Sequence, residues 1–227
     1  MPAEHEPHSG CLMAWPSRAE LWGERLEAAT HEYAAVARTI AAFEPVTMVC
    51  NPGLAADVRN LCGDGVTPVE IPINDSWIRD SGPAFVRDHT GTVAAVGFGF
   101  NAWGNRWHPH DDDARLAERL AAYFSVPFFR APFVLEGGSF FVDGEGTLIN
   151  PEQCLLNPNR NAHWTQEGAE VSLKRALGVE KVLWLDEGLL NDHTDGHIDN
   201  LARFVAPGKV VCQAPANRDD PNHDVLE

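Results

Sequence analysis

Three acidic residues occupy the same position in three copies of one local pattern. Asp80, Glu136 and Asp199 each lie five residues before a Phe-Val pair. In every copy the pair leads through a turn into a second apolar stretch, which is typical of a β-hairpin. A repeated unit that delivers one carboxylate each time can direct several carboxylates toward one centre. Such a centre suits a cationic ligand or acid–base chemistry.

The segment NDHTDGHIDN, residues 191–200, carries histidine and aspartate at alternate positions: His193, Asp195, His197 and Asp199. If the segment is extended, all four side chains share one face. Imidazole and carboxylate groups bind metals, so one interpretation is a metal-dependent hydrolase that uses this cluster. The other is an acid–base pair in which Asp199 orients or charges His197. Both interpretations give the segment a chemical role.

The loop NDSWIRDSGP, residues 74–83, places Trp77 close to Asp80. An aromatic ring face and a carboxylate both attract a guanidinium group, so this loop is a candidate cation site. The alternative is structural. In that case Arg79 forms a local ion pair with Asp75 or Asp80, and the tryptophan lies in the core.

Glu136 stands directly before Gly137 and Gly138. Because glycine has no side chain, the backbone there can come close to a ligand or to another strand. Taken alone, a solvated glutamate at the start of a strand is the better explanation. The offset that Glu136 shares with Asp80 and Asp199 favours a place in the site.

Hydrophobic periodicity indicates the elements that must position these residues. Helices are predicted over residues 22–43, 54–61, 112–124 and 165–177, and strands over 11–16, 46–50, 69–73 and 182–185. Hairpins are predicted over 84–100, 138–150 and 201–213. The order strand, strand, helix, strand then recurs with a period of roughly 55–65 residues, long for a structural repeat. Radial repetition of such units covers the strand edges and lets the loops before the hairpins converge.

The composition narrows the class of protein. With 227 residues, of which 44% are hydrophobic, the chain has room for one large domain or two small ones. A formal net charge of −16 argues against a nucleic-acid partner and is compatible with a cationic ligand. The five cysteines form no C-x-x-C pair, which favours a reducing cytoplasm over a disulfide framework or a zinc ribbon. The N-terminus is polar, and no apolar run is long enough to cross a membrane.

Three other segments receive structural interpretations. In WHPHDDD, residues 107–113, the aspartates are expected to cap the following helix, which explains them without a metal. GFGFNAWG, residues 97–104, lacks the spacing of a phosphate loop and is set aside. Near the C-terminus, Asp220 and Pro221 predict the start of a helix, with Asp220 as the N-cap. We expect that helix to continue beyond Glu227.

Four motifs together carry a resemblance to a known family: MPAEHEPHSGCLMAWP, NDSWIRDSGP, EGGSFFVDGEGTLINPEQCLLNPNRN and NDHTDGHIDNLARFV. With these motifs the chain resembles the agmatine deiminase family, related to the bacterial-type peptidyl-arginine deiminases in the guanidine-modifying (pentein) superfamily. They span almost the whole chain. The resemblance implies a five-bladed α/β propeller with the active site on its axis. Residues 1–227 are then a single domain that lacks its C-terminal part.

The resemblance also implies an activity and a role for each candidate residue. The reaction is hydrolysis of agmatine to N-carbamoylputrescine and ammonia, a step of putrescine and polyamine biosynthesis, without a metal or another cofactor. Asp80 and Asp199 would grip the guanidinium group, and Trp77 would pack against the substrate. His197 would be the general acid and base, and Glu136 would assist it.

Two departures from the family pattern leave alternatives open. None of the five cysteines matches the family's nucleophile, a cysteine well downstream of the HxD motif, so we expect binding of a guanidinium group without turnover. His193 stands where many relatives carry an acid for the distal amine, so peptidyl-arginine or another guanidine is an alternative substrate. A metal-dependent hydrolase and a non-catalytic guanidine-binding fragment are further alternatives. Exposed strand edges make a homo-oligomer possible.

Overall fold

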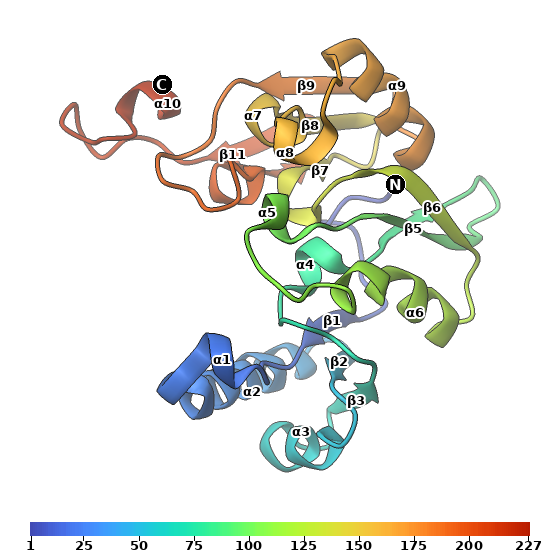
Figure 1. Cartoon of the computed structure of the whole chain (residues 1–227). Helices are drawn as coiled ribbons and strands as arrows, with labels where there is room; N and C mark the ends of the chain where they lie inside the picture. The colour runs from blue at the N-terminus through green and yellow to red at the C-terminus, as the bar shows by residue number, and fades with distance from the viewer.

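Four small sheets make up the computed structural model, which describes all residues from 1 to 227 (Figure 1). The strands are β1 (Cys11–Ala14), β2 (Val46–Cys50), β3 (Val66–Glu70), β4 (Ala84–Arg87), β5 (Val93–Gly99), β6 (Phe128–Val134), β7 (Phe141–Val142), β8 (Thr147–Pro151), β9 (Lys181–Leu185), β10 (Ala202–Ala206) and β11 (Lys209–Cys212). The longer helices are α2 (Leu26–Ala41), α3 (Ala55–Cys62), α6 (Leu116–Tyr123) and α9 (Gln166–Leu177). All four lie within or next to a range predicted as helical.

The first sheet contains three parallel strands in the order β1-β2-β3. The helices α2 and α3 connect them, and Ala34 of α2 and Met48 of β2 belong to the same buried apolar cluster. The helix predicted over 22–43 is divided in the structure. Gly23 has a φ of 52°, so α1 (Ala19–Trp22) and the 3-10 helix η1 (Gly23–Arg25) precede α2.

The strand predicted over 69–73 lies three residues earlier, at Val66–Glu70. Its register is set by β2, because Val46 pairs with Val66. Pro68 has no N–H to donate, and it is tolerated because β3 is the edge strand of its sheet. The backbone N–H of Ile71 still donates to Cys50 of β2, and the chain then leaves the sheet as the loop that carries Asp80.

The second and third sheets repeat one unit. In the second, the antiparallel hairpin β4–β5 is followed by α6, and β6 returns parallel to β5. In the third, the hairpin β7–β8 is followed by α9, and β9 returns parallel to β8. The predicted order of strand, strand, helix and strand is confirmed in both sheets.

The strand β6 was not predicted from the sequence. Its apolar residues do not alternate cleanly, since Phe129 is 60% exposed and Pro132 interrupts the run. The pairing with β5 also shifts in register between Gly97 and Gly99. A strand with a proline and an irregular register is accommodated at a sheet edge, and β6 is the edge strand here.

The fourth sheet is the predicted hairpin, β10–β11, alone. The short helix α10 (His223–Leu226) follows it, but Asp220 is not its N-cap as predicted. The Asp220 carboxylate accepts from the backbone N–H groups of Ala216 and Asn222 and so closes the preceding turn. The helix begins three residues later than Asp220.

The largest apolar cluster joins the second and third sheets. It contains 15 buried residues, among them Phe98, Phe133, Phe140, Leu148 and Leu173. Because these residues come from both sheets and from α9, the two repeated units are packed against one another. None of the helices combines the length and the apolar character that crossing a bilayer requires.

Candidate active site

Three short helical turns carry the three acidic residues that share an offset. They are α4 (Ile78–Ser81) with Asp80, η3 (Gly137–Ser139) directly after Glu136, and η4 (Ile198–Asn200) with Asp199. Each turn directly precedes a hairpin, and the three hairpins belong to three different sheets (Figure 1). The turn η3 contacts both α4 and η4, so the three turns meet in space.

Asp80, His197 and Asp199 converge on Gly138. A β-carbon placed on Gly138 would lie 2.6 Å from Asp199 Oδ2, 2.6 Å from His197 Nδ1 and 2.8 Å from Asp80 Oδ1. The Gly138 N–H itself donates to Asp80 Oδ1 at 2.8 Å and fixes that carboxylate. Two carboxylate oxygens and one imidazole nitrogen around one point suit a planar cation with several N–H donors.

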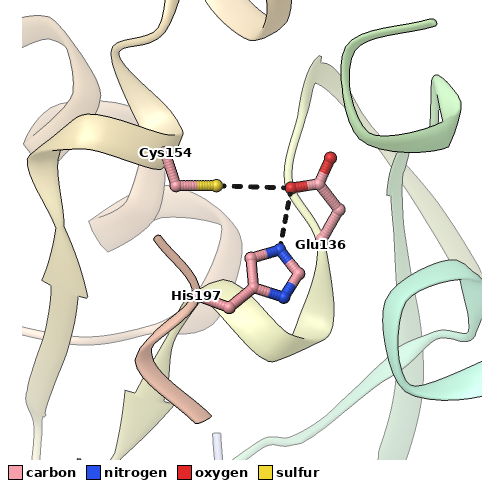
Figure 2. Close-up of side chains that lie close together, drawn as sticks. All are labelled: Glu136, Cys154 and His197. Atoms are coloured by element: carbon pink, nitrogen blue, oxygen red, sulfur yellow. Dashed lines mark hydrogen bonds and ion pairs between the residues drawn. The ribbon is translucent and has the colours of Figure 1, made fainter. Parts of the chain in front are cut away.

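Glu136 is the centre of a buried hydrogen-bonded group (Figure 2). Its Oε2 accepts from His197 Nε2 at 3.2 Å and from Cys154 Sγ at 3.4 Å. Its Oε1 accepts from Arg160 Nε at 2.6 Å. All four side chains are almost completely buried, which excludes the solvated glutamate considered from the sequence. Because Nε2 of His197 is bonded to Glu136, its Nδ1 is the nitrogen that faces Gly138.

Arg160 connects Glu136 to the loop that carries His197. It lies on α8 (Pro158–Asn161), which begins with proline and is capped by the Asn157 side chain. From there Nη1 pairs with Asp195 Oδ2 at 2.8 Å, in addition to the bond from Nε to Glu136. A single buried guanidinium thus holds two carboxylates from different segments.

The buried groups shift one another's pKa values. Burial opposes charging of His197, but the hydrogen bond to Glu136 and the nearby Asp80 charge outweigh it and raise the pKa of His197. Burial also opposes ionisation of Glu136, yet His197 and Arg160 together lower its pKa. Burial raises the pKa of Asp80, although the His197 charge opposes this. Burial and the Glu136 charge raise the pKa of the Cys154 thiol, which keeps it protonated.

The segment 191–200 is not extended. The Asp192 carboxylate accepts from the backbone N–H groups of Thr194 at 2.8 Å and His197 at 3.1 Å, which folds the segment into turns. Asp195 adopts a left-handed φ of 63°. Alternate residues therefore do not share one face, and the prediction that they would is wrong.

The four alternating residues also do not form a metal site. His193 is exposed, and the Asp195 carboxylate is already paired with Arg160. The one group with three possible ligand atoms within 4.8 Å of one another is Glu136, Cys154 and His197. The Arg160 charge neutralises Glu136 in that group and the thiol is protonated, so these residues are better suited to hydrogen bonding than to a divalent ion.

The structural alternative for the loop 74–83 is also wrong. Arg79 pairs with Glu4 rather than with Asp75 or Asp80. Trp77 directly precedes α4 and its side chain is 49% exposed, so it does not belong to the core. The loop therefore offers the Asp80 carboxylate and the Trp77 ring. Neither is paired with the arginine of the loop, Arg79.

Asp113 supports this loop instead of capping a helix, which corrects the interpretation of residues 107–113. Its carboxylate is buried and accepts from the backbone N–H groups of Asn74 at 2.8 Å and Asp75 at 3.1 Å. Burial raises the pKa of Asp113 to about 6. Asp113, the last residue of the aspartate run, thus helps to fix the loop that precedes Asp80.

Sequence reasoning missed three buried residues: Trp103, Cys154 and Arg160. Cys154 and Arg160 belong to the motif NPEQCLLNPNRN. In this motif an arginine stands between two asparagines shortly after a proline, and this unusual setting could have indicated a role for Arg160. Trp103 lies in the segment that was set aside for lacking phosphate-loop spacing. Its indole Nε1 donates to Asp80 Oδ2 at 3.0 Å, so the segment contributes to the site by a contact that its glycine spacing did not indicate.

Repeated strand–strand–helix–strand units whose inner turns bring polar residues together define a pentein-type α/β propeller. The chain matches the model of the Porphyromonas-type peptidyl-arginine deiminase family over residues 1–227. It therefore belongs to that family.

Similar proteins with names and with solved structures agree with this assignment. A putative agmatine deiminase of Legionella pneumophila is 45% identical over 229 residues, covering 100% of this chain and 66% of the relative. The agmatine deiminase of Pseudomonas aeruginosa is also 45% identical, covering 98% of this chain and 62% of the relative. The structure of the Enterococcus faecalis agmatine deiminase matches with a TM-score of 0.95 and 36% identity, covering 100% of this chain and 63% of that one. The chain thus spans about two thirds of the length of these relatives.

Proposed function

We propose that this chain supplies the guanidine-binding and acid–base part of a site that hydrolyses agmatine to N-carbamoylputrescine and ammonia. The observation that carries the proposal is the convergence of polar atoms of Asp80, His197 and Asp199 on Gly138. The names of the relatives point to the same substrate.

In this proposal Asp80 and Asp199 bind the N–H groups of the guanidinium. The exposed ring of Trp77 packs against the substrate. His197 holds its Nδ1 toward the reacting group and delivers the proton that the departing ammonia requires, while Glu136 stabilises the charged imidazole through Nε2. The reacting carbon then needs a nucleophile on its open side.

None of the five cysteines supplies that nucleophile in the proposal. Cys154 is the one cysteine in the site, and its buried thiol is protonated and donates to Glu136. A thiolate would have to add to the guanidinium carbon, release ammonia and form a thiouronium intermediate, which water then hydrolyses. We therefore propose that the 227-residue chain binds guanidines without turning them over, and that the product of the whole gene performs the hydrolysis.

Agmatine titration of the 227-residue chain tests the proposal by calorimetry. We expect saturable binding by the wild-type chain and a loss of affinity of roughly 100-fold in Asp80→Asn, because an amide of the same size cannot offer a charged acceptor. Putrescine, which has no guanidinium group, is the control ligand and should bind far more weakly. Equal affinity for agmatine and putrescine, or an unaffected Asp80→Asn, would refute guanidine recognition.

Turnover is tested separately on the product of the whole gene. We expect ammonia and N-carbamoylputrescine from agmatine, and loss of both in His197→Ala. An arginine-containing peptide serves as the competing substrate, because the family model names peptidyl-arginine deiminases. If the peptide is citrullinated and agmatine is left intact, the choice of agmatine is wrong while guanidine hydrolysis stands.

Agmatine affinity should rise with pH between about 5 and 8, where its guanidinium stays charged. Burial raises the pKa of Asp80, so this clamp loses its charge at a higher pH than an ordinary aspartate does. The pKa of His197 is also raised, so its positive charge opposes the guanidinium until that proton is lost. Both effects strengthen binding as pH rises. Calorimetry across this range checks the direction, and a flat profile would contradict it.

The proposal extends to the setting of the protein. All five cysteines are unpaired, which supports a reducing cytoplasm. The acidic charge supports a small cationic substrate and no nucleic-acid partner. We propose that residues 1–227 act as one domain. A homo-oligomer is supported by the exposed valines of the hairpin β10–β11, Val205 and Val211.

A further inference from the structure

Four consecutive residues adopt left-handed backbone angles next to the site. They are Ala102, Trp103, Gly104 and Asn105, with φ values of 50°, 55°, 84° and 61°. Three of the four carry a side chain, and for L-residues this region is disfavoured because Cβ approaches the carbonyl oxygen. This left-handed turn, labelled α5 (Ala102–Asn105), lies beside α8 (Figure 1). Its presence therefore requires strong stabilising contacts.

Those contacts fix the turn from several sides. The Asn101 side chain accepts from the Gly104 N–H at 2.9 Å, and its amide donates to the Asn159 carbonyl at 2.9 Å. The Trp103 ring packs edge-on against Phe100 with centroids 5.2 Å apart. Strained backbone that is held this firmly is concentrated at functional sites.

The turn delivers one polar group to the site. Trp103 is buried, and its Nε1–H donates to Asp80 Oδ2 at 3.0 Å. The Gly138 N–H donates to the other oxygen, Oδ1, so each oxygen of Asp80 has a fixed donor. Oδ1 also lies with His197 and Asp199 around Gly138, whereas the indole holds Oδ2.

The turn also contacts the other side of the site. A β-carbon on Gly104 would lie 2.4 Å from Asn159 Nδ2 and 2.9 Å from Arg160 Nη1, so a side chain at this position would displace them. Arg106, directly after the turn, binds the Asp195 carboxylate and the His193 carbonyl. The same short segment therefore reaches both Asp80 and the loop of His197.

We propose that Trp103 is a positioning residue for Asp80, and that the left-handed turn is the device that aims its indole N–H at that carboxylate. The indole orients Asp80 so that Oδ1 points to the guanidinium, and it favours the ionised form of the clamp. The expected effect of Trp103 on agmatine binding rests on the proposed function. Its expected effect on the Asp80 carboxylate does not depend on any substrate.

The test is the titration of Asp80 in the free protein, followed by carboxyl-carbon NMR with labelled aspartate. Trp103→Phe removes the N–H and keeps the ring, and we expect the pKa of Asp80 to rise. His197, Glu136 and Asp199 also face Asp80, and their identities are unchanged in the variant. Agmatine affinity at neutral pH should fall roughly tenfold, which is the loss of one hydrogen bond to a charged group.

Trp184→Phe is the matched control, because the Trp184 indole also donates to a carboxylate, Glu170 Oε1 at 3.2 Å, away from the site. It should leave the Asp80 titration and agmatine binding unchanged. If Trp103→Phe does not fold, Asn101→Ala decides, since it loosens the same turn without touching Asp80, and it should raise the pKa of Asp80. An unchanged Asp80 titration in the folded variant overturns the inference. A wild-type chain that binds no agmatine refutes the proposed function, while the titration still decides the role of Trp103.

Discussion

Gly138→Ala should sharply weaken agmatine binding. The added methyl group would lie within 2.8 Å of Asp80 Oδ1, His197 Nδ1 and Asp199 Oδ2, closer than these atoms can tolerate. It displaces the polar atoms that are proposed to hold the guanidinium, so neither clamping carboxylate keeps its position. Losing two charge-assisted contacts of about 1.5–3 kcal/mol each corresponds to an affinity loss of at least about 100-fold. Calorimetry with agmatine measures the loss.

Gly168→Ala is the matched control for this substitution. Gly168 lies in the first turn of α9, and a β-carbon there meets only Thr165 Oγ1 at 3.5 Å. Replacing glycine by alanine inside a helix stabilises a protein by roughly 0.5–1 kcal/mol. This variant should therefore bind agmatine normally and have a slightly higher free energy of unfolding. If Gly138→Ala binds agmatine as the wild type does, the side chains that converge on Gly138 do not hold the guanidinium.

The repeated hairpins were predictable because the residues that determine each hairpin lie close together in the sequence. Apolar pairs and turn dipeptides such as Asp143-Gly144 encode each hairpin within about a dozen residues. Since each hairpin follows a turn that bears Asp80, Glu136 or Asp199, the repeat alone predicted that these residues meet. The strand β6 escaped prediction because its stability comes from pairing with β5, which its own sequence does not indicate.

The supporting residues were not predictable in the same way. Trp103 lies 23 positions from Asp80, and Arg160 lies 24 positions from Glu136 and 35 from Asp195. No periodicity connects such residues, because the contacts exist only after separate units have packed together. The alternation in segment 191–200 misled for a related reason. The alternation indicates an extended segment. The hydrogen bonds that the Asp192 carboxylate accepts from the backbone stabilise turns instead.

Arg160→Met should be the most destabilising single substitution in the site, at about 3–5 kcal/mol in the free energy of unfolding. Methionine fills a similar volume without a charge, so the variant leaves the buried Glu136 without its closest cation. Asp195 loses a partner too, but it retains Arg106. Urea unfolding followed by circular dichroism measures the loss.

A double-mutant cycle with Glu136→Gln separates the charge effect from lost packing. If the cost of Arg160→Met comes from the uncompensated carboxylate, adding Glu136→Gln should recover part of the stability, because a neutral amide needs no counter-charge. Arg160→Lys keeps the charge but lacks the planar guanidinium whose separate nitrogens bond Glu136 and Asp195, so its cost should be intermediate. A coupling energy near zero between Arg160 and Glu136 would instead mean that the arginine stabilises the chain through Asp195 and its own packing. In that case the orientation of Glu136 toward His197 would depend on the surrounding apolar residues and not on this ion pair.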